Sequence, residues 1–169
     1  MSFTRQGLIF REVEPTDLPL LRQWRNDEHM AQGWHDPVSI QTPHAQSDWY
    51  RSLDRSNQAF IAMDKQLTVG LLRFRLDHAN RRAALTGTDV APDSQGAGYG
   101  KRILRAGAEH VLITLGMHRV TAEALATNVA AIHIIQAAGF KPEGMYRQYV
   151  WRNGKWQDWH FFSLLEGEI

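Results

Sequence analysis

The chain has 169 residues, 43% of them hydrophobic and 22% charged, with a net charge of +1; this predicts one globular domain over residues 1–169 and argues against a broad nucleic-acid or membrane surface. There is no cysteine, which excludes disulfides, thiolate nucleophiles and cysteine-based metal sites. No apolar run approaches the roughly 20 residues of a membrane span, and the first residues lack the apolar core of a signal peptide, so we expect a cytoplasmic protein.

The first part of the chain predicts a strand followed by two helices. Residues 8–13 form the strand, and the first helix begins near Asp17. The second helix begins at Thr42, an N-cap residue, with Pro43 at its first position. Residues 31–39 between the helices lack periodicity and predict a loop. Helical spacing predicts buried faces made by Leu18, Leu21 and Trp24 in the first helix and by Ala45, Trp49 and Leu53 in the second.

Beyond the second helix the hydrophobic period changes to that of strands. Residues 59–63 and 67–74 flank a short polar turn and predict an antiparallel hairpin. A third strand, ending at residue 90, completes a meander. Residues 101–115 carry apolar side chains at helical spacing, and Gly116 follows them as a helix C′ residue.

The last third of the chain predicts a strand, a helix and a hairpin. Residues 118–124 form the strand, and Asn128 caps the helix over residues 129–138, which is apolar nearly all round and therefore expected to be buried. The hairpin strands lie on either side of an Asn-Gly turn, over residues 140–150 and 155–165. The fold class is α/β, a mixed, mostly antiparallel sheet flanked by helices in the order β-αα-βββ-α-β-α-ββ.

A glycine-rich turn, Gln95-Gly96-Ala97-Gly98-Tyr99-Gly100, joins the third meander strand to the next helix. In such a strand–turn–helix unit, backbone N–H groups and the positive end of the helix converge on phosphate oxygens. The Gly-Lys-Ser/Thr of a P-loop is absent, and the glycine spacing differs from a dinucleotide fingerprint. An anion site of another kind is therefore predicted, with an ordinary glycine-rich connection as the alternative.

The turn resembles the Gln/Arg-x-x-Gly-x-Gly/Ala pyrophosphate loop of the GNAT superfamily of acetyl-CoA-dependent N-acetyltransferases, with Gln95, Gly98 and Gly100 at the matching positions. The order of elements is also the GNAT order. Two further segments resemble the family, Val90-Ala91-Pro92 before the loop and the run from Asn128 to Gly139-Phe140. The resemblance covers nearly the whole chain and implies a GNAT-like fold that forms a single acyl-CoA N-acyltransferase domain, residues 1–169.

Two other segments resemble one branch of that superfamily, Trp24-Arg25-Asn26 and residues 152–158. This branch contains ribosomal-protein N-terminal acetyltransferases and the N-acetyltransferases of bacterial 4-amino sugars. The resemblance thus implies two classes of amine acceptor, a peptide N-terminus or a nucleotide-linked amino sugar.

The resemblance also implies how acetyl-CoA is bound as the cosubstrate. The loop amides cradle the pyrophosphate, the backbone N–H of Val90 polarises the thioester carbonyl, and Asn128 contacts the pantetheine arm besides capping its helix. Lys101 and Arg102, which follow the loop, add charge for a phosphate, or else belong to a solvated helix face. The implied cofactor-binding residues are Val90, Gln95, Gly96, Ala97, Gly98, Tyr99, Gly100, Lys101 and Asn128.

An amine substrate arrives protonated at neutral pH, so transfer needs a general base. Glu123 is our candidate because it lies five residues before Asn128, where N-terminal alanine acetyltransferases of the family keep a glutamate. An exposed glutamate without a role is the alternative. Asp89 is the second candidate for the base.

The usual general acid of the family is missing. Many members use a tyrosine seven residues after the capping asparagine, and here that position is Ile135. Tyr146, Tyr149 and His133 are near in sequence, but nothing selects one, and a coenzyme A thiolate can also take its proton from water. The departure keeps open an alternative function, a catalytically inactive acyl-CoA-binding module.

Remaining expectations concern the partners. The scattered histidines indicate no metal site. Trp34, in the irregular stretch, is expected either to contact the acceptor or to pack over the core. A homodimer through the exposed final hairpin is consistent with the pattern.

Overall fold

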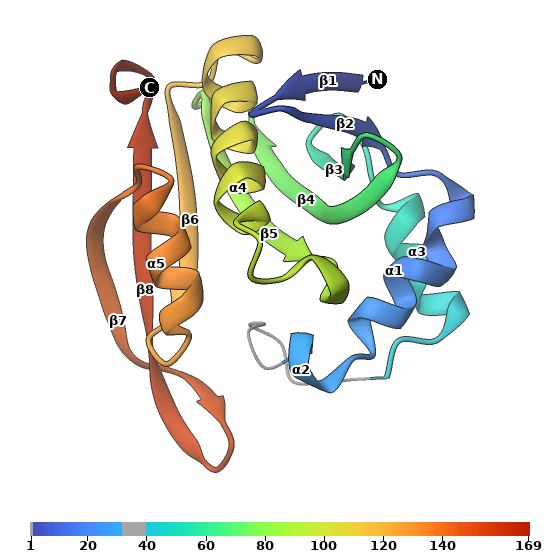
Figure 1. The fold of residues 1–169 in the computed structure, drawn as a ribbon. Coiled ribbons are helices and arrows are strands. Elements are labelled where there is room, and N and C mark those ends of the chain that lie inside the picture. The colour runs from blue at the N-terminus through green and yellow to red at the C-terminus, as the bar shows by residue number, and fades with distance from the viewer. Residues whose placement is uncertain (1, 32–39) are drawn as a thin grey trace.

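The computed structural model describes residues 2–31 and 40–169 and is built on one eight-stranded sheet (Figure 1). Strands follow the order β1-β2-β3-β4-β5-β6-β8-β7, and only β5 and β6 pair in parallel. The predicted α/β class with a mixed, mostly antiparallel sheet is confirmed. The strands are β1 (Ser2–Arg5), β2 (Leu8–Glu12), β3 (Asn57–Asp64), β4 (Leu67–Asp77), β5 (Arg82–Val90), β6 (Arg119–Leu125), β7 (Lys141–Arg152) and β8 (Lys155–Leu165).

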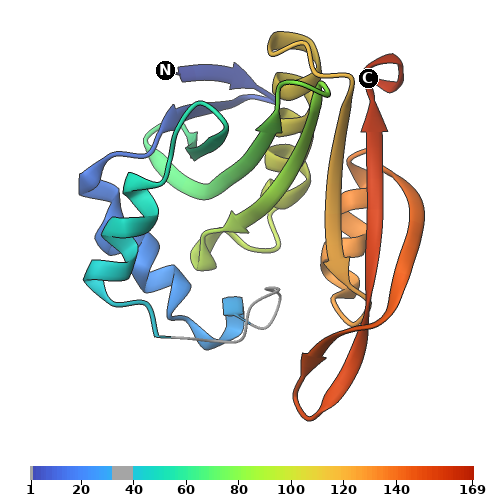
Figure 2. The same ribbon diagram turned by 180° about the vertical axis from the view of Figure 1, so that it is seen from behind.

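Helices cover both faces of the sheet (Figures 1 and 2). Side chains of α4 and α5 share one hydrophobic cluster with the sheet, and α1 and α3 form a second cluster on the opposite face. Within the described ranges, no helix has the length and apolar character needed to cross a membrane. The helices are α1 (Leu18–Arg25), α2 (Glu28–Ala31), α3 (Pro43–Arg51), α4 (Tyr99–Glu109) and α5 (Val129–Ala137).

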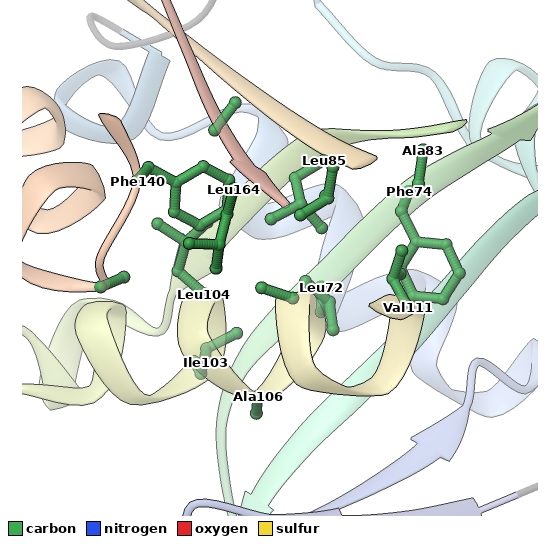
Figure 3. Close-up of a cluster of buried hydrophobic side chains, with 14 of the residues drawn as sticks. Leu72, Phe74, Ala83, Leu85, Ile103, Leu104, Ala106, Val111, Phe140 and Leu164 are labelled. Carbon is green, nitrogen blue, oxygen red and sulfur yellow. The ribbon is translucent and has the colours of Figure 1, made fainter. Parts of the chain in front are cut away.

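The larger cluster fixes α4 against the sheet (Figure 3). Ile103 and Leu104 are buried together with Leu72 of β4 and Leu85 of β5. A Cβ atom at Gly107 would lie 2.8 Å from Cδ1 of Leu72, so a larger residue at this position would have to displace the buried Leu72 side chain or the helix. This packing sets the position of the N-terminus of α4, where the glycine-rich turn ends.

Predictions that rest on local chemistry are confirmed. The Thr42 hydroxyl accepts a hydrogen bond from the backbone N of Ala45 at 3.1 Å, and Pro43 opens α3. In the final hairpin both turn residues, Asn153 and Gly154, have positive φ (51° and 75°), as a type I′ turn requires. Gly116, with φ 66°, follows the helix predicted over residues 101–115, whose last turn, His110–Thr114, is π-helical.

One strand was missing from the prediction. Residues 2–5 form β1, which pairs antiparallel with β2. The signal for it was a two-residue turn, Gln6 and Gly7, whose φ angles are 52° and 68°. The helices also differ by one short element, α2, which follows Asn26.

Two expectations about burial were wrong. Ala45 is exposed and Gln46 is buried, because α3 turns its Gln46–Trp49 side toward the sheet. In α5 only Ile135 is buried, and Val129 is 71% exposed. This helix lies against the sheet on one side and beside α4, and its outer side has no cover among the described residues, so its apolar composition does not indicate burial. Trp34 and the predicted loop around it lie largely outside the described residues.

Candidate active site

The centre of the site is a parting between β5 and β6 (Figure 2). The two strands pair over only three residues, Arg82–Ala84 with Arg119–Thr121. Beyond that point they have no further register partners in each other, whereas β4 stays paired with β5 up to Val90 and β8 stays paired with β6 up to Leu125. The end of β5 therefore has a free edge facing β6.

The backbone N–H of Val90 lies on that free edge. The amide of Ala91 donates to the carbonyl of Val69 at 2.9 Å, which makes these two residues a hydrogen-bonded pair. Bonded and non-bonded pairs alternate along an antiparallel ladder, so the preceding pair, Val90 with Gly70, is non-bonded. The Val90 N–H consequently points away from β4 and toward the parting, as a donor to a thioester carbonyl would need to.

The glycine-rich turn leads from this strand into α4. Gly96 and Gly98 both have positive φ (78° and 81°), and Gly98 is the N-cap residue. No described group accepts a backbone hydrogen bond from residues 96–98, and the amides of residues 99–101 belong to the first helical turn, which has no intrahelical acceptor. Gln95 and the turn after it are exposed. The sequence-predicted loop thus presents a row of open N–H groups at a helix N-terminus.

Gly100 is needed for close packing, unlike Gly96 and Gly98, whose role is a positive φ angle. A Cβ atom at this position would lie 3.0 Å from Cδ1 of Ile134 and 3.5 Å from Cγ2 of Val90. The absence of a side chain therefore lets the start of α4 pack against both β5 and α5, which brings the open amides next to the Val90 edge.

Tyr99 ties the same turn to the β3–β4 connection. Its hydroxyl donates to Oδ2 of Asp64 at 2.9 Å, and this bond raises the pKa of the Tyr99 phenol. Arg102 lies over the Tyr99 ring and forms an ion pair with Asp64, and its Nε donates to the carbonyl of Gln6 at 3.1 Å. The charge of Arg102 is thus directed at Asp64, while Lys101 is exposed and forms no ion pair with a described residue. No sequence pattern indicated the Asp64 contact, because it joins residues 35 positions apart.

Asn128 begins α5 beside the end of β6. Its Oδ1 accepts a hydrogen bond from the amide of Ala131 at 3.1 Å, which confirms the predicted N-cap. Contact with a pantetheine arm stays a prediction for this residue.

Glu123 lies on β6 two positions after Thr121, the last residue of β6 that pairs with β5. It is exposed, and its Oε2 accepts a hydrogen bond from Nε1 of Trp159 at 2.8 Å. Its other oxygen, Oε1, has no hydrogen-bond partner among the described residues. Glu123 is therefore oriented by a buried indole at the point where the strands part, with one oxygen left to take a proton directly or through water.

Aromatic rings on β7 and β8 lie next to Glu123 and Trp159. The ring of Tyr146 lies edge-on to Phe161 with centroids 4.3 Å apart, and Tyr149 lies 5.0 Å from Tyr146. Phe161 is the register partner of Glu123, and Tyr146 that of Trp159. Next to them a bulge in β7 opens a groove of about 690 Å³ whose lining includes Tyr146 and Asp158.

Asp89, the second candidate base, is held in an ion pair. It is 7% exposed, and Arg73 Nη2 lies 3.0 Å from its Oδ2. The Arg73 guanidinium extends across Gly87, where a Cβ atom would lie 2.1 Å from Nη2. This arrangement indicates a structural role, in which Asp89 neutralises an arginine packed flat on β5.

The position at which many family members have a tyrosine is occupied here by a buried core residue. Ile135 is 5% exposed and belongs to the larger hydrophobic cluster. Tyr146 and Tyr149 are about half exposed and His133 is exposed. Their exposure does not identify any one of these three residues as the general acid. Among residues 2–31 and 40–169, no three histidine, aspartate or glutamate side chains gather as they would around a metal ion.

Comparison with known proteins agrees with this geometry. The sequence model of the acetyltransferase (GNAT) domain matches residues 7–141. The spermidine N(1)-acetyltransferase of Vibrio cholerae is 23% identical over 95% of this chain and 94% of its own length, and the uncharacterized N-acetyltransferase YnaD of Bacillus subtilis is 20% identical over 99% of each.

Solved structures have the same fold. The spermidine N-acetyltransferase from Vibrio cholerae in complex with CoA and spermine superposes with a TM-score of 0.89, at 20% identity over 96% of this chain and 97% of that one. A GNAT-family acetyltransferase from Bacillus anthracis superposes with a TM-score of 0.84, at 18% identity over 99% and 100%.

Proposed function

Because this chain belongs to the GNAT acetyltransferase family, we propose that it uses Glu123 as the general base for direct transfer of an acetyl group from acetyl-CoA to a primary amine. Coenzyme A supplies the acetyl group as a thioester. The observation that carries the proposal is the parting of β5 and β6, with the free N–H of Val90 on one strand and the oriented carboxylate of Glu123 on the other.

Each residue of the site has a separate role in the proposed reaction. The open amides of residues 96–101 hold the pyrophosphate, and Asn128 holds the pantetheine arm. The Val90 N–H stabilises charge on the thioester oxygen. Glu123 removes a proton from the ammonium group, the nitrogen lone pair forms the new C–N bond, and the C–S bond breaks. The chain has no cysteine to carry an acyl group, which favours direct transfer.

The departing thiolate takes its proton from water in this scheme. Ile135 is buried and carries no proton, so α5 supplies no acid at the position that the family resemblance indicates. A coenzyme A thiol resembles cysteine in acidity, with a pKa near 8.5. A thiolate of that basicity is a tolerable leaving group at neutral pH, and a positioned acid is therefore dispensable.

The acceptor classes are a peptide N-terminus and a nucleotide-linked amino sugar, as the sequence resemblance implies. The similar Vibrio cholerae enzyme, which is named for spermidine, adds a polyamine to the compounds worth testing.

The decisive experiment compares the wild-type protein with Glu123→Gln in a thiol-release assay across peptides, amino sugars and spermidine. For the best acceptor we expect kcat to fall by about 10²- to 10⁴-fold in the variant, with the Kd for acetyl-CoA unchanged in calorimetry. The deficit should shrink as pH rises, because more of the amine is then unprotonated. A variant with unchanged kcat would disprove the base assignment, and acetyl-CoA binding without release on any amine would instead support the inactive binding module.

A further inference from the structure

Arg152 is a buried guanidinium whose polar atoms lack partners. The residue lies next to the turn between β7 and β8 and is only 9% exposed. Two of its three nitrogens, Nε and Nη2, are out of contact with solvent and make no hydrogen bond. Burial of an arginine that is unpaired is costly, and arginines buried in folded proteins are therefore usually matched by an anion.

The side chain lies on the same face of the sheet as the candidate base. Val150, Arg152 and Gln157 are buried on this part of the hairpin, and Val150 packs with Trp159 and Leu125. Register pairs share a face in an antiparallel sheet, so Arg152 and Val150 lie on the same face as Gln157 of β8. Alternate residues of β8 continue this face from Gln157 to Trp159, which donates a hydrogen bond to Glu123. This face is opposite to α4 and α5. The β8 side chains that share a hydrophobic cluster with those helices, Phe162 and Leu164, alternate along the strand with those on the face of Gln157 and Trp159.

Charge on the end of the hairpin is predominantly positive. Arg147, Arg152 and Lys155 lie here with one acid, Asp158, whose Oδ1 accepts a hydrogen bond from the amide of Gln148 at 2.7 Å. No carboxylate among the described residues forms an ion pair with any of these three cations. By contrast, Lys141 and Arg119 near the other end of the hairpin are both paired with glutamates. The unpaired cations are thus confined to one end.

We propose that Arg152 binds an anionic group of the acceptor, a phosphate or a carboxylate, while the acceptor amine lies at Glu123. This deepens the proposed function and rests on it. Six residue steps along β8 separate Phe161, opposite Glu123, from Lys155, opposite Arg152. At about 3.4 Å per residue this is ~20 Å between backbone positions. Allowing for the reach of both side chains, the anion lies on the order of 15 Å from the amine.

This spacing and charge select among acceptors. A peptide with glutamate or aspartate at its fourth or fifth position has a carboxylate at such a distance, since an extended chain spans about 3.4 Å per residue. In a sugar amine joined to a nucleoside diphosphate only one sugar ring separates the amine from the phosphates, which therefore lie closer to the amine than this spacing, so the spacing favours the peptide. The guanidinium fork matches both groups. A polyamine, which has only cationic groups, would be repelled by the same end of the hairpin.

The test uses calorimetric titration of the full chain saturated with coenzyme A, so that the pyrophosphate loop is occupied. Uridine diphosphate is one probe. The others are a pentapeptide with glutamates at its last two positions and the same peptide with glutamines. We expect one anionic probe to bind the wild-type protein and Arg152→Met to weaken it about 10- to 100-fold, which is the usual size of a hydrogen bond to a charged group. The probe whose binding is weakened by Arg152→Met shows whether the anion of the acceptor is a phosphate or a carboxylate.

Lys155→Met is the matched control, because it removes an exposed charge from the position opposite Arg152. It should change the Kd by less than about threefold. Arg152→Lys, which keeps the charge and loses the fork, should fall between the wild type and Arg152→Met. The Arg152→Met protein should melt no lower than the wild type, because the change removes an unpaired buried charge, so weakened binding would not be attributable to unfolding.

The proposal is overturned if neither anionic probe binds, or if Arg152→Met binds them as tightly as the wild type. It is also overturned if Lys155→Met has the same effect as Arg152→Met. Binding is measured without turnover, and Glu123→Gln should retain it. Loss of acetyl transfer with intact, Arg152-dependent anion binding would therefore contradict the proposed function alone.

Discussion

The indole Nε1 of Trp159 donates a hydrogen bond to Oε2 of Glu123 at 2.8 Å, across the β6–β8 pairing. Trp159 is 5% exposed and packs with Leu125 and Val150, so the donor is held by the core of that half of the sheet. The carboxylate is exposed on one side and fixed on the other. An exposed glutamate would otherwise sample several rotamers, only some of which serve a proton transfer.

Trp159→Phe should therefore lower kcat without removing Glu123, the proposed base. The ring remains to fill the core, and the donor is lost, so we expect a decrease of about 5- to 10-fold in kcat, consistent with one hydrogen bond of about 1 kcal/mol. The informative measurement is a double-mutant cycle with Glu123→Gln. If Trp159 acts through Glu123, then Trp159→Phe has no further effect on kcat in the Glu123→Gln background. An additive loss would show that the tryptophan contacts the acceptor independently.

Gly100→Ala should weaken acetyl-CoA binding and lower stability. The added methyl group meets Ile134 Cδ1 at 3.0 Å and Val90 Cγ2 at 3.5 Å, so the end of the Ile134 side chain, packed between α5 and α4, has to give way by a few tenths of an ångström. Overpacking of this size costs about 1–3 kcal/mol, visible as a lower free energy of unfolding in urea and a raised Kd for acetyl-CoA. Ile134→Val in the same protein removes the closest atom and should restore both quantities. Failure of this second change to restore them would refute the steric explanation.

Much of this site could be predicted from the sequence because its chemistry is local. The N-caps at Thr42 and Asn128 and the Asn153-Gly154 turn all depend on residues within four positions of each other. The loop at residues 95–100 lies between a strand and a helix that could each be recognised by period. Such elements need no knowledge of which strands are neighbours.

The remainder depends on register and on which surfaces are covered. The Trp159–Glu123 bond joins residues 36 positions apart, and the Tyr99–Asp64 bond joins residues 35 apart. The exposure of α5 could not be read from its composition, because an apolar helix is buried only where other elements cover it. Arg152 was recognised only as part of a family-like segment, and its burial follows from the alternation of the paired hairpin.

Asp89→Asn should destabilise the protein while leaving the chemistry of the folded fraction unchanged. The substitution removes the charge that faces Arg73 across 3.0 Å and leaves the arginine buried against Gly87. Breaking a buried pair from one side costs about 3–5 kcal/mol, which a chemical denaturation curve would detect. Replacing Arg73 with methionine in the same chain should recover much of the loss. If Asp89→Asn instead abolished turnover without lowering stability, Asp89 and not Glu123 would be the better candidate for the base.

His110 should make the folded state sensitive to mild acid. Its imidazole is 2% exposed, is stacked on Phe3 with centroids 3.8 Å apart, and has no hydrogen-bond partner on either nitrogen. Burial, with a smaller contribution from Arg5, lowers the pKa of His110 to about 4 from its ordinary value of 6.5. Between pH 6.5 and 4 the unfolded chain therefore binds more protons than the folded one, and the free energy of unfolding falls as pH falls through that window.

His110→Phe should flatten this dependence. The phenyl ring would have Phe3, Phe60 and Phe74 as its neighbours and has no polar atom to bury. Comparing urea unfolding at pH 7 and pH 4.5, we expect the wild type to lose about 2 kcal/mol more than the variant. His44→Ala, at an exposed position on α3, is the control and should behave like the wild type. An equal loss in wild type and His110→Phe would mean that the acid sensitivity comes from carboxylates, and that the buried imidazole adds nothing to it.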